Sequence, residues 1–148
     1  MIRVFIIPFV CEDVINILIP RVKSEIKSEK VSLKIIGTGT GNVSMTDPDT
    51  LSSFIQWGAS NFPANRYELI FWDHGSGSIS GYGYDEKFVS SGQMSLAGIN
   101  NALKKGGVTF DFIGFDTCLL ATMENALMLD SYADYMIASE ETEPGIGW

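Results

Sequence analysis

The sequence has few of the residues that mark several large classes of protein. Its 148 residues include two cysteines and one histidine, too few for a disulfide framework and in no zinc-binding pattern. Ten basic residues stand against 18 acidic ones, for a net charge of −8, so nucleic acid is not an expected partner. No apolar run reaches the roughly 18–20 residues that cross a bilayer. What is present, 45% hydrophobic and 19% charged residues, is typical of a folded globular protein.

Apolar strand-like runs alternate with amphipathic segments along the chain, which is long enough for one domain over residues 1–148. The patterns predict strands at 3–10, 31–36, 67–72, 110–115 and 135–139, and helices at 13–30, 48–61, 96–105 and 118–129. Asp47 and Ser95 are the expected caps of the second and third helices, and Asp116 or Thr117 that of the last. Helices between apolar strands indicate an α/β fold with a mostly parallel sheet covered on both faces.

The two ends of the chain carry their own expectations. The first apolar stretch, residues 1–11, is interpreted as a buried strand and not a signal peptide, because Glu12 and Asp13 follow it and no small-residue cleavage site does. The chain stops soon after a predicted strand, whereas parallel sheets usually continue through further crossovers. We therefore expect the C-terminal part of the domain to be missing and the acidic segment 140–145 to be a loop near the functional site.

The only histidine and one of the cysteines each follow a predicted strand. His74 comes just after the run 67–72, and Cys118 just after the run 110–115. Because reactive groups gather at the carboxyl ends of parallel strands, we expect both side chains at the same edge of the sheet. A histidine beside a cysteine is the arrangement of a thiol nucleophile with its base. A buried structural cysteine and a surface histidine are the alternatives.

The neighbours of this pair have candidate roles of their own. If a helix begins at Cys118, its N-terminal N–H groups favour the thiolate. The N–H groups of Cys118 and Gly75 are then candidates for holding an oxyanion. Asp116 either caps that helix or pairs with a cationic substrate side chain. Asp73 is disfavoured as a partner of His74, because adjacent strand residues point to opposite faces.

Longer stretches around these residues resemble the clostripain family of cysteine peptidases, relatives of caspases, legumains and gingipains. The resemblance covers roughly residues 40–148 and rests on several motifs in order. These are NVSMTDP (42–48), LIFWDHG (69–75), GYGYD (81–85), IGFDTCL (113–119) and ASEETEPG (138–145). It implies a caspase-like three-layer sandwich, and the part of the family's catalytic region that follows the last motif has no counterpart here.

The resemblance also implies a mechanism and its partners. His74 would be the general base and Cys118 the nucleophile of an endopeptidase that forms a thioacyl-enzyme and cleaves after Arg or Lys. Asp116 matches the acidic position that binds the basic side chain. Family members are commonly precursors cut after a basic residue, which makes Lys87 the candidate processing site and the rest of the precursor a partner beside protein or peptide substrates. Calcium is the one implied cofactor, and a secreted or periplasmic location is implied.

Two alternatives from other classes stay open. One is a non-catalytic peptidase-like scaffold that keeps the fold without a working groove. The other is a flavodoxin-like module that binds a phosphate or nucleotide through the glycine-rich segments 37–42 and 75–81. The second segment lacks the Lys-Ser/Thr ending of a phosphate loop, so that signal is weak.

Overall fold

The computed structural model describes residues 2–8 and 43–144, with side chains from residue 43 onward. Residues 2–8 and 44–144 belong to one compact unit. Three predicted features lie outside the described residues: the helix 13–30, the strand 31–36 and the glycine-rich segment 37–42. No helix in the described part of the chain is both long and apolar enough to cross a membrane.

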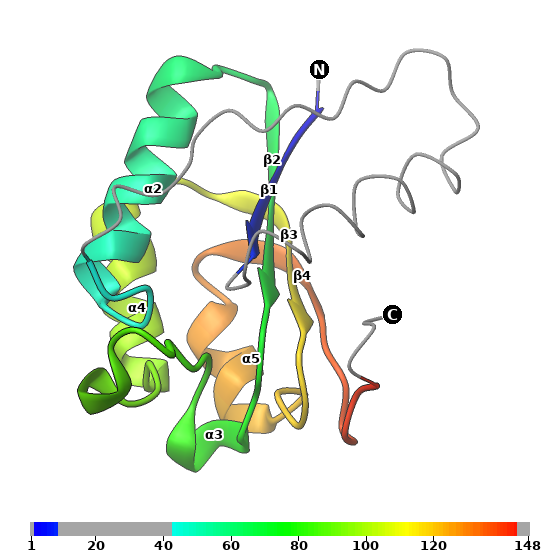
Figure 1. The fold of residues 1–148 in the computed structure, drawn as a ribbon. Helices are drawn as coiled ribbons and strands as arrows, with labels where there is room; N and C mark the ends of the chain where they lie inside the picture. Colours follow the sequence, from blue (N-terminus) through cyan, green and yellow to red (C-terminus); the bar gives the residue numbers. More distant parts are fainter. Residues whose placement is uncertain (1, 9–42, 145–148) are drawn as a thin grey trace. The chain divides into compact units, whose positions relative to one another are not determined.

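Strands and helices alternate through this unit (Figure 1). In chain order they are β1 (Ile2–Pro8), α2 (Pro48–Asn61), β2 (Arg66–Trp72), α3 (Gly77–Ser80), the 3-10 helix η1 (Val89–Ser91), α4 (Leu96–Gly106), β3 (Phe110–Asp116), α5 (Met123–Leu129) and β4 (Ala133–Ile137). The sheet order is β1-β2-β3-β4, and each neighbouring pair is parallel. The predicted parallel α/β sheet is thus confirmed, with the last strand starting two residues earlier than expected.

The two central helices begin where their caps predict. The Asp47 carboxylate accepts a hydrogen bond from the Asp49 N–H at 2.8 Å, and the Ser95 hydroxyl accepts one from the Gly98 N–H at 3.1 Å. These side chains satisfy N–H groups that have no partner inside the helix. At the other end of α4, Gly107 adopts a left-handed conformation with φ 69°, which ends the helix at little steric cost.

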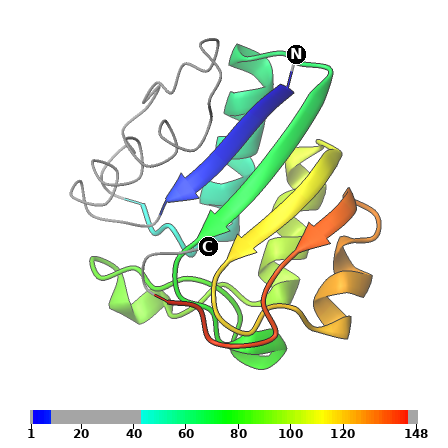
Figure 2. The same cartoon turned by 90° about the vertical axis from the view of Figure 1, so that its right-hand side faces the viewer.

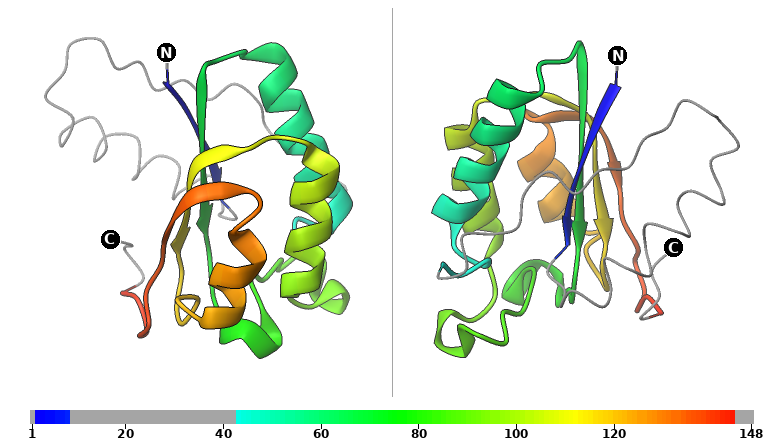
Figure 3. Two further views of the ribbon diagram at one scale, coloured as in Figure 1. Left: turned by 180° about the vertical axis from the view of Figure 1, so that it is seen from behind. Right: turned by 45° about the horizontal axis from the view of Figure 1, so that its top comes forward.

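The helices α2, α4 and α5 lie on one face of the sheet (Figure 3). Between them and the sheet is a core of buried side chains from both layers. It includes Leu51, Ile55, Ile99, Ala102 and Leu103 from the helices and Leu69, Phe71, Ile113 and Phe115 from the strands. Alternate residues of β2 and β3 point into this core, as expected of a pleated strand. The described residues do not test the predicted cover on the other face.

The last helix departs from its prediction in position and in phase. It begins at Met123 and not at Cys118, because the Thr122 hydroxyl accepts the Asn125 N–H at 3.2 Å and caps it there. Of the four side chains expected to point inward, Leu120 is fully buried, whereas Leu119, Met123 and Leu127 are exposed. The helix buries Asn125 and Leu129 instead.

Candidate active site

The loops that follow β2, β3 and β4 lie at the same edge of the sheet, because the strands are parallel (Figure 2). His74 lies in the loop after β2 and is exposed, while Cys118 lies in the loop after β3 and is partly buried. Asp116 is the last residue of β3 and pairs in register with Trp72. Asp116 is therefore part of the strand, and the prediction that it or Thr117 caps a helix is wrong.

The two loops that carry His74 and Cys118 pack directly on each other at Gly75. A Cβ placed on Gly75 would lie 2.1 Å from the Cys118 carbonyl oxygen and 2.9 Å from the Thr117 hydroxyl. No side chain fits at that separation, so this position requires glycine for reasons of space. The contact confirms that the two strand ends bring these segments together.

The loop after β2 contains β-bridges of its own. Gly75 and Tyr82 form a β-bridge, and Tyr82 forms a second one with Met94. The flanking hydrogen bonds are Ser76 N–H to Gly81 O at 3.0 Å and Gly83 N–H to His74 O at 2.8 Å. The Tyr82 ring packs edge-on against Phe71 at 4.9 Å, and Phe71 stacks on Phe115 at 4.8 Å. The loop beside His74 is thereby joined to the ends of both strands.

Asp73 contacts the main chain of His74. Its carboxylate accepts hydrogen bonds from the His74 N–H and from the Tyr84 N–H at 3.3 Å. Burial raises the pKa of the Asp73 carboxyl, and these two N–H groups act in the opposite direction. Burial, and then the negative charge of Asp73, raises the pKa of Tyr82 well above its usual range. Sequence reasoning considered Asp73 only as a partner of the imidazole and missed this main-chain contact.

Cys118 lies in a turn and carries a free thiol. The next residue, Leu119, has φ 62°, which interrupts any helix at this point. The turn is held by the segment after β4: Leu119 N–H donates to Glu141 O at 3.0 Å, and Ala121 N–H donates to Ser139 O at 2.9 Å. The helix N-terminus that was expected to favour a thiolate at Cys118 is therefore absent.

The expected oxyanion donors are the main-chain N–H groups of Gly75 and Cys118. Among the described residues, none accepts a hydrogen bond from the N–H of Gly75 or of Cys118. An amide without a protein partner beside a nucleophile can donate to the oxygen of a tetrahedral intermediate. The packing of Gly75 on Cys118 places both amides in the same part of the molecule.

Lys87 is exposed in the loop between the two strand ends. The carboxylate of Asp85 organises this turn, since it accepts the Lys87 N–H at 2.9 Å and the Met45 N–H at 2.9 Å. The side chain of Lys87 is thus presented on a turn whose start is anchored. This placement is compatible with access by a peptidase.

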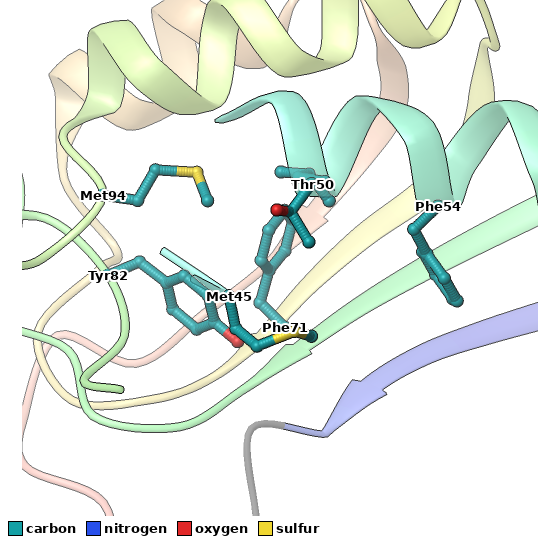
Figure 4. Close-up of a pocket in the computed structure, with 7 residues that line it drawn as sticks. Met45, Thr50, Phe54, Phe71, Tyr82 and Met94 are labelled. Atoms are coloured by element: carbon teal, nitrogen blue, oxygen red, sulfur yellow. The ribbon is translucent and has the colours of Figure 1, made fainter. Parts of the chain in front are cut away.

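A small apolar pocket lies beside the site, between α2 and the sheet (Figure 4). It is lined by Met45, Thr50, Leu51, Phe54, Phe71, Tyr82 and Met94. None of the candidate catalytic residues contributes to it, and its lining offers no charge for a basic substrate side chain. We assign it to the core beneath the loop 74–94.

In the part of the chain that the structure describes, no three acidic, histidine or cysteine side chains gather to hold a metal ion. Main-chain carbonyl and side-chain amide oxygens also bind calcium, so the calcium implied by the resemblance stays an expectation, and no step below involves a metal.

Comparison with known proteins identifies the family of this chain. The chain matches the Clostripain family over residues 16–148, a match that begins earlier than the motifs indicated. A secreted C11 cysteine protease from Bacteroides thetaiotaomicron, solved with an irreversible peptide inhibitor, is 32% identical with a TM-score of 0.62 and is matched over 69% of this chain and 30% of its own. An inactive zymogen C11 protease from Parabacteroides distasonis is 28% identical, with a TM-score of 0.62, over 76% and 32%.

A third solved structure, the secreted C11 cysteine protease "iotapain" from Bacteroides thetaiotaomicron, is 20% identical with a TM-score of 0.60 and shows the fold alone. The match covers 70% of this chain and 33% of iotapain, so the chain spans about a third of the length of each of these structures. No curated protein sequence matched the chain. The caspase-like fold expected from resemblance agrees with these similarities.

Proposed function

Since the chain belongs to the clostripain family, we propose that it is a cysteine endopeptidase in which His74 and Cys118 form the catalytic dyad and that it cleaves after Arg or Lys. The observation that carries this proposal is the packing of Gly75 on Cys118, because it brings the histidine loop onto the cysteine loop. The two loops follow the neighbouring parallel strands β2 and β3. Reactive groups of α/β proteins gather at such carboxyl ends of strands.

The chemistry follows from the groups at this edge. His74 takes the thiol proton, and the Cys118 sulfur forms a bond to the scissile carbonyl carbon. The Gly75 and Cys118 N–H groups bind the oxygen that becomes negative. His74 then gives the proton to the leaving amine, the C–N bond breaks, and a thioacyl-enzyme remains. Water activated by His74 attacks this thioester, which releases the new carboxylic acid and restores the thiol.

The experiment that tests the proposal is covalent labelling of Cys118. A peptide ending in Arg or Lys with an acyloxymethyl ketone should alkylate the sulfur and lose its acyloxy group, as seen by mass spectrometry of the Cys118 peptide. The matched control is the same reagent ending in norleucine, which has a similar aliphatic stem without the charge. Equal labelling by both reagents would contradict the basic specificity, and no labelling by either would favour a non-catalytic scaffold.

Asp116 is the residue that we propose binds the basic side chain of the substrate. Replacing it with asparagine keeps the size and removes the charge, so kcat/KM on Arg and Lys reporters should fall on the order of a hundredfold, as for loss of one partner of a hydrogen-bonded charge pair. Cleavage of a norleucine reporter should change little. An equal loss on all reporters would show that Asp116 acts only as part of β3.

Lys87 is the proposed site of self-cleavage. Incubation of the protein should produce a new N-terminus at Phe88, as found by N-terminal sequencing, and Lys87→Ala should remove it. Lys104→Ala is the matched control, because Lys104 is also exposed but lies within α4. A cut that persists in Lys87→Ala, or one that disappears equally in Lys104→Ala, would refute this assignment.

Two further proposals rest on the resemblance: a secreted or periplasmic location, and calcium as a cofactor. The similar structure that is 32% identical is described as a secreted protease, which supports secretion or export to the periplasm for this chain.

A further inference from the structure

The Cys118 sulfur accepts a hydrogen bond from a residue far along the chain. The main-chain N–H of Glu143 lies 3.3 Å from Cys118 Sγ, and the sulfur also lies 3.9 Å from the Glu143 carbonyl oxygen. Because the helix expected at Cys118 begins only at Met123, its N-terminus does not lie at this thiol. The Glu143 N–H is in the position to donate to the sulfur.

Several hydrogen bonds of the segment 139–143 fix the position of the Glu143 N–H. The segment accepts the N–H groups of Leu119 and Ala121 through the Glu141 and Ser139 carbonyl oxygens, at 3.0 and 2.9 Å. Within the segment, the Ser139 hydroxyl accepts the Glu141 N–H at 3.1 Å. Together these bonds hold the residues just after Cys118 against one strip of main chain.

We propose that the main-chain N–H of Glu143 stabilises the thiolate of Cys118 and is thereby part of the catalytic machinery, an inference that rests on the proposed function. A hydrogen bond to the charged form of a group favours that form, and the thiolate is the species that attacks. When His74 takes the thiol proton, the Glu143 N–H donates to the sulfur that has become negative. The carboxylate of Glu143 is not required and, being negative, opposes the thiolate.

The test removes the N–H while the control keeps it. Glu143→Pro has no main-chain N–H, whereas Glu143→Ala loses only the carboxylate. The readout is the rate of alkylation by iodoacetamide at pH 7, measured by mass spectrometry on the Cys118 peptide, so that the second cysteine of the sequence does not contribute to it. We expect Glu143→Pro to react about tenfold more slowly than the unaltered chain, as for loss of one hydrogen bond to a charged group. Glu143→Ala should react at least as fast as the unaltered chain.

The outcomes separate this inference from the proposed function. A Glu143→Pro rate equal to that of Glu143→Ala, with far-UV circular dichroism unchanged, would overturn the inference. If Glu143→Pro does not fold, Ser139→Ala decides: it loses the bond to the Glu141 N–H, so a two- to threefold slower reaction is expected for a single loosened contact and an unchanged rate refutes the inference. Alkylation does not depend on peptide hydrolysis. If Glu143→Pro is alkylated more slowly than Glu143→Ala while the unaltered chain does not cleave Arg or Lys reporters, the peptidase proposal is refuted and the hydrogen bond to the sulfur is supported.

Discussion

Replacing Gly75 with alanine is expected to lower the free energy of unfolding by about 3 kcal/mol or more and to abolish labelling of Cys118, because the added methyl cannot be accommodated. The clash is with main chain: the new Cβ would lie 2.1 Å from the Cys118 carbonyl oxygen. A backbone atom cannot rotate away as a flexible side chain can, so one loop must move off the other. That movement separates His74 from Cys118.

A second glycine of the same loop supplies the control. Gly92 has φ 65° and nothing within 4 Å of an added Cβ, so Gly92→Ala costs only the strain of a left-handed residue, about 1–2 kcal/mol. Urea denaturation and labelling of Cys118 should therefore separate the two variants. If Gly75→Ala is as stable as Gly92→Ala and its Cys118 is still labelled, the two loops are not in the contact that the structure shows.

Replacing Cys118 with alanine is expected to reduce hydrolysis of Arg and Lys reporters by at least about a thousandfold. The remaining activity would come from the oxyanion donors and from substrate binding. The variant should unfold at nearly the urea concentration of the unaltered chain, since Cys118 is only partly buried and its sulfur makes only weak hydrogen bonds.

His74→Ala should lose activity to a similar extent, and the double variant should lose little more, because the two groups act as a unit. Initial rates on a fluorogenic reporter measure all three proteins. Full activity in Cys118→Ala would disprove the dyad, and additive losses in the double variant would show that the two residues act separately.

Local patterns in the sequence predicted the framework that positions the site. The apolar runs at 67–72 and 110–115 became β2 and β3, since a run of this length fits a buried parallel strand. Asp47 and Ser95 predicted the starts of α2 and α4, because a capping side chain acts within three residues of itself. Such signals lie close together in the chain and can be recognised without the fold.

The turn after β3 could not be predicted in the same way. A strand followed by Thr117 and an apolar run also fits a helix that begins at Cys118, which is what the sequence favoured. The structure differs because the amides of Leu119 and Ala121 donate to Glu141 and Ser139, residues about twenty positions further on. The contact of Glu143 with the sulfur has the same origin. A motif such as ASEETEPG can indicate proximity to the site, but not which main-chain atom faces the thiol.

The pairing of Tyr82 with Met94 closes the chain between them into a loop. Met94 N–H donates to Tyr82 O at 2.8 Å, and Tyr82 N–H donates to Met94 O at 2.9 Å, so the two ends of the segment are hydrogen-bonded to each other. Tyr82 is fully buried beneath the loop that carries His74. A cut or an insertion in the middle of this segment, near Lys87, should therefore leave its two ends bonded to each other and Tyr82 in place beneath His74.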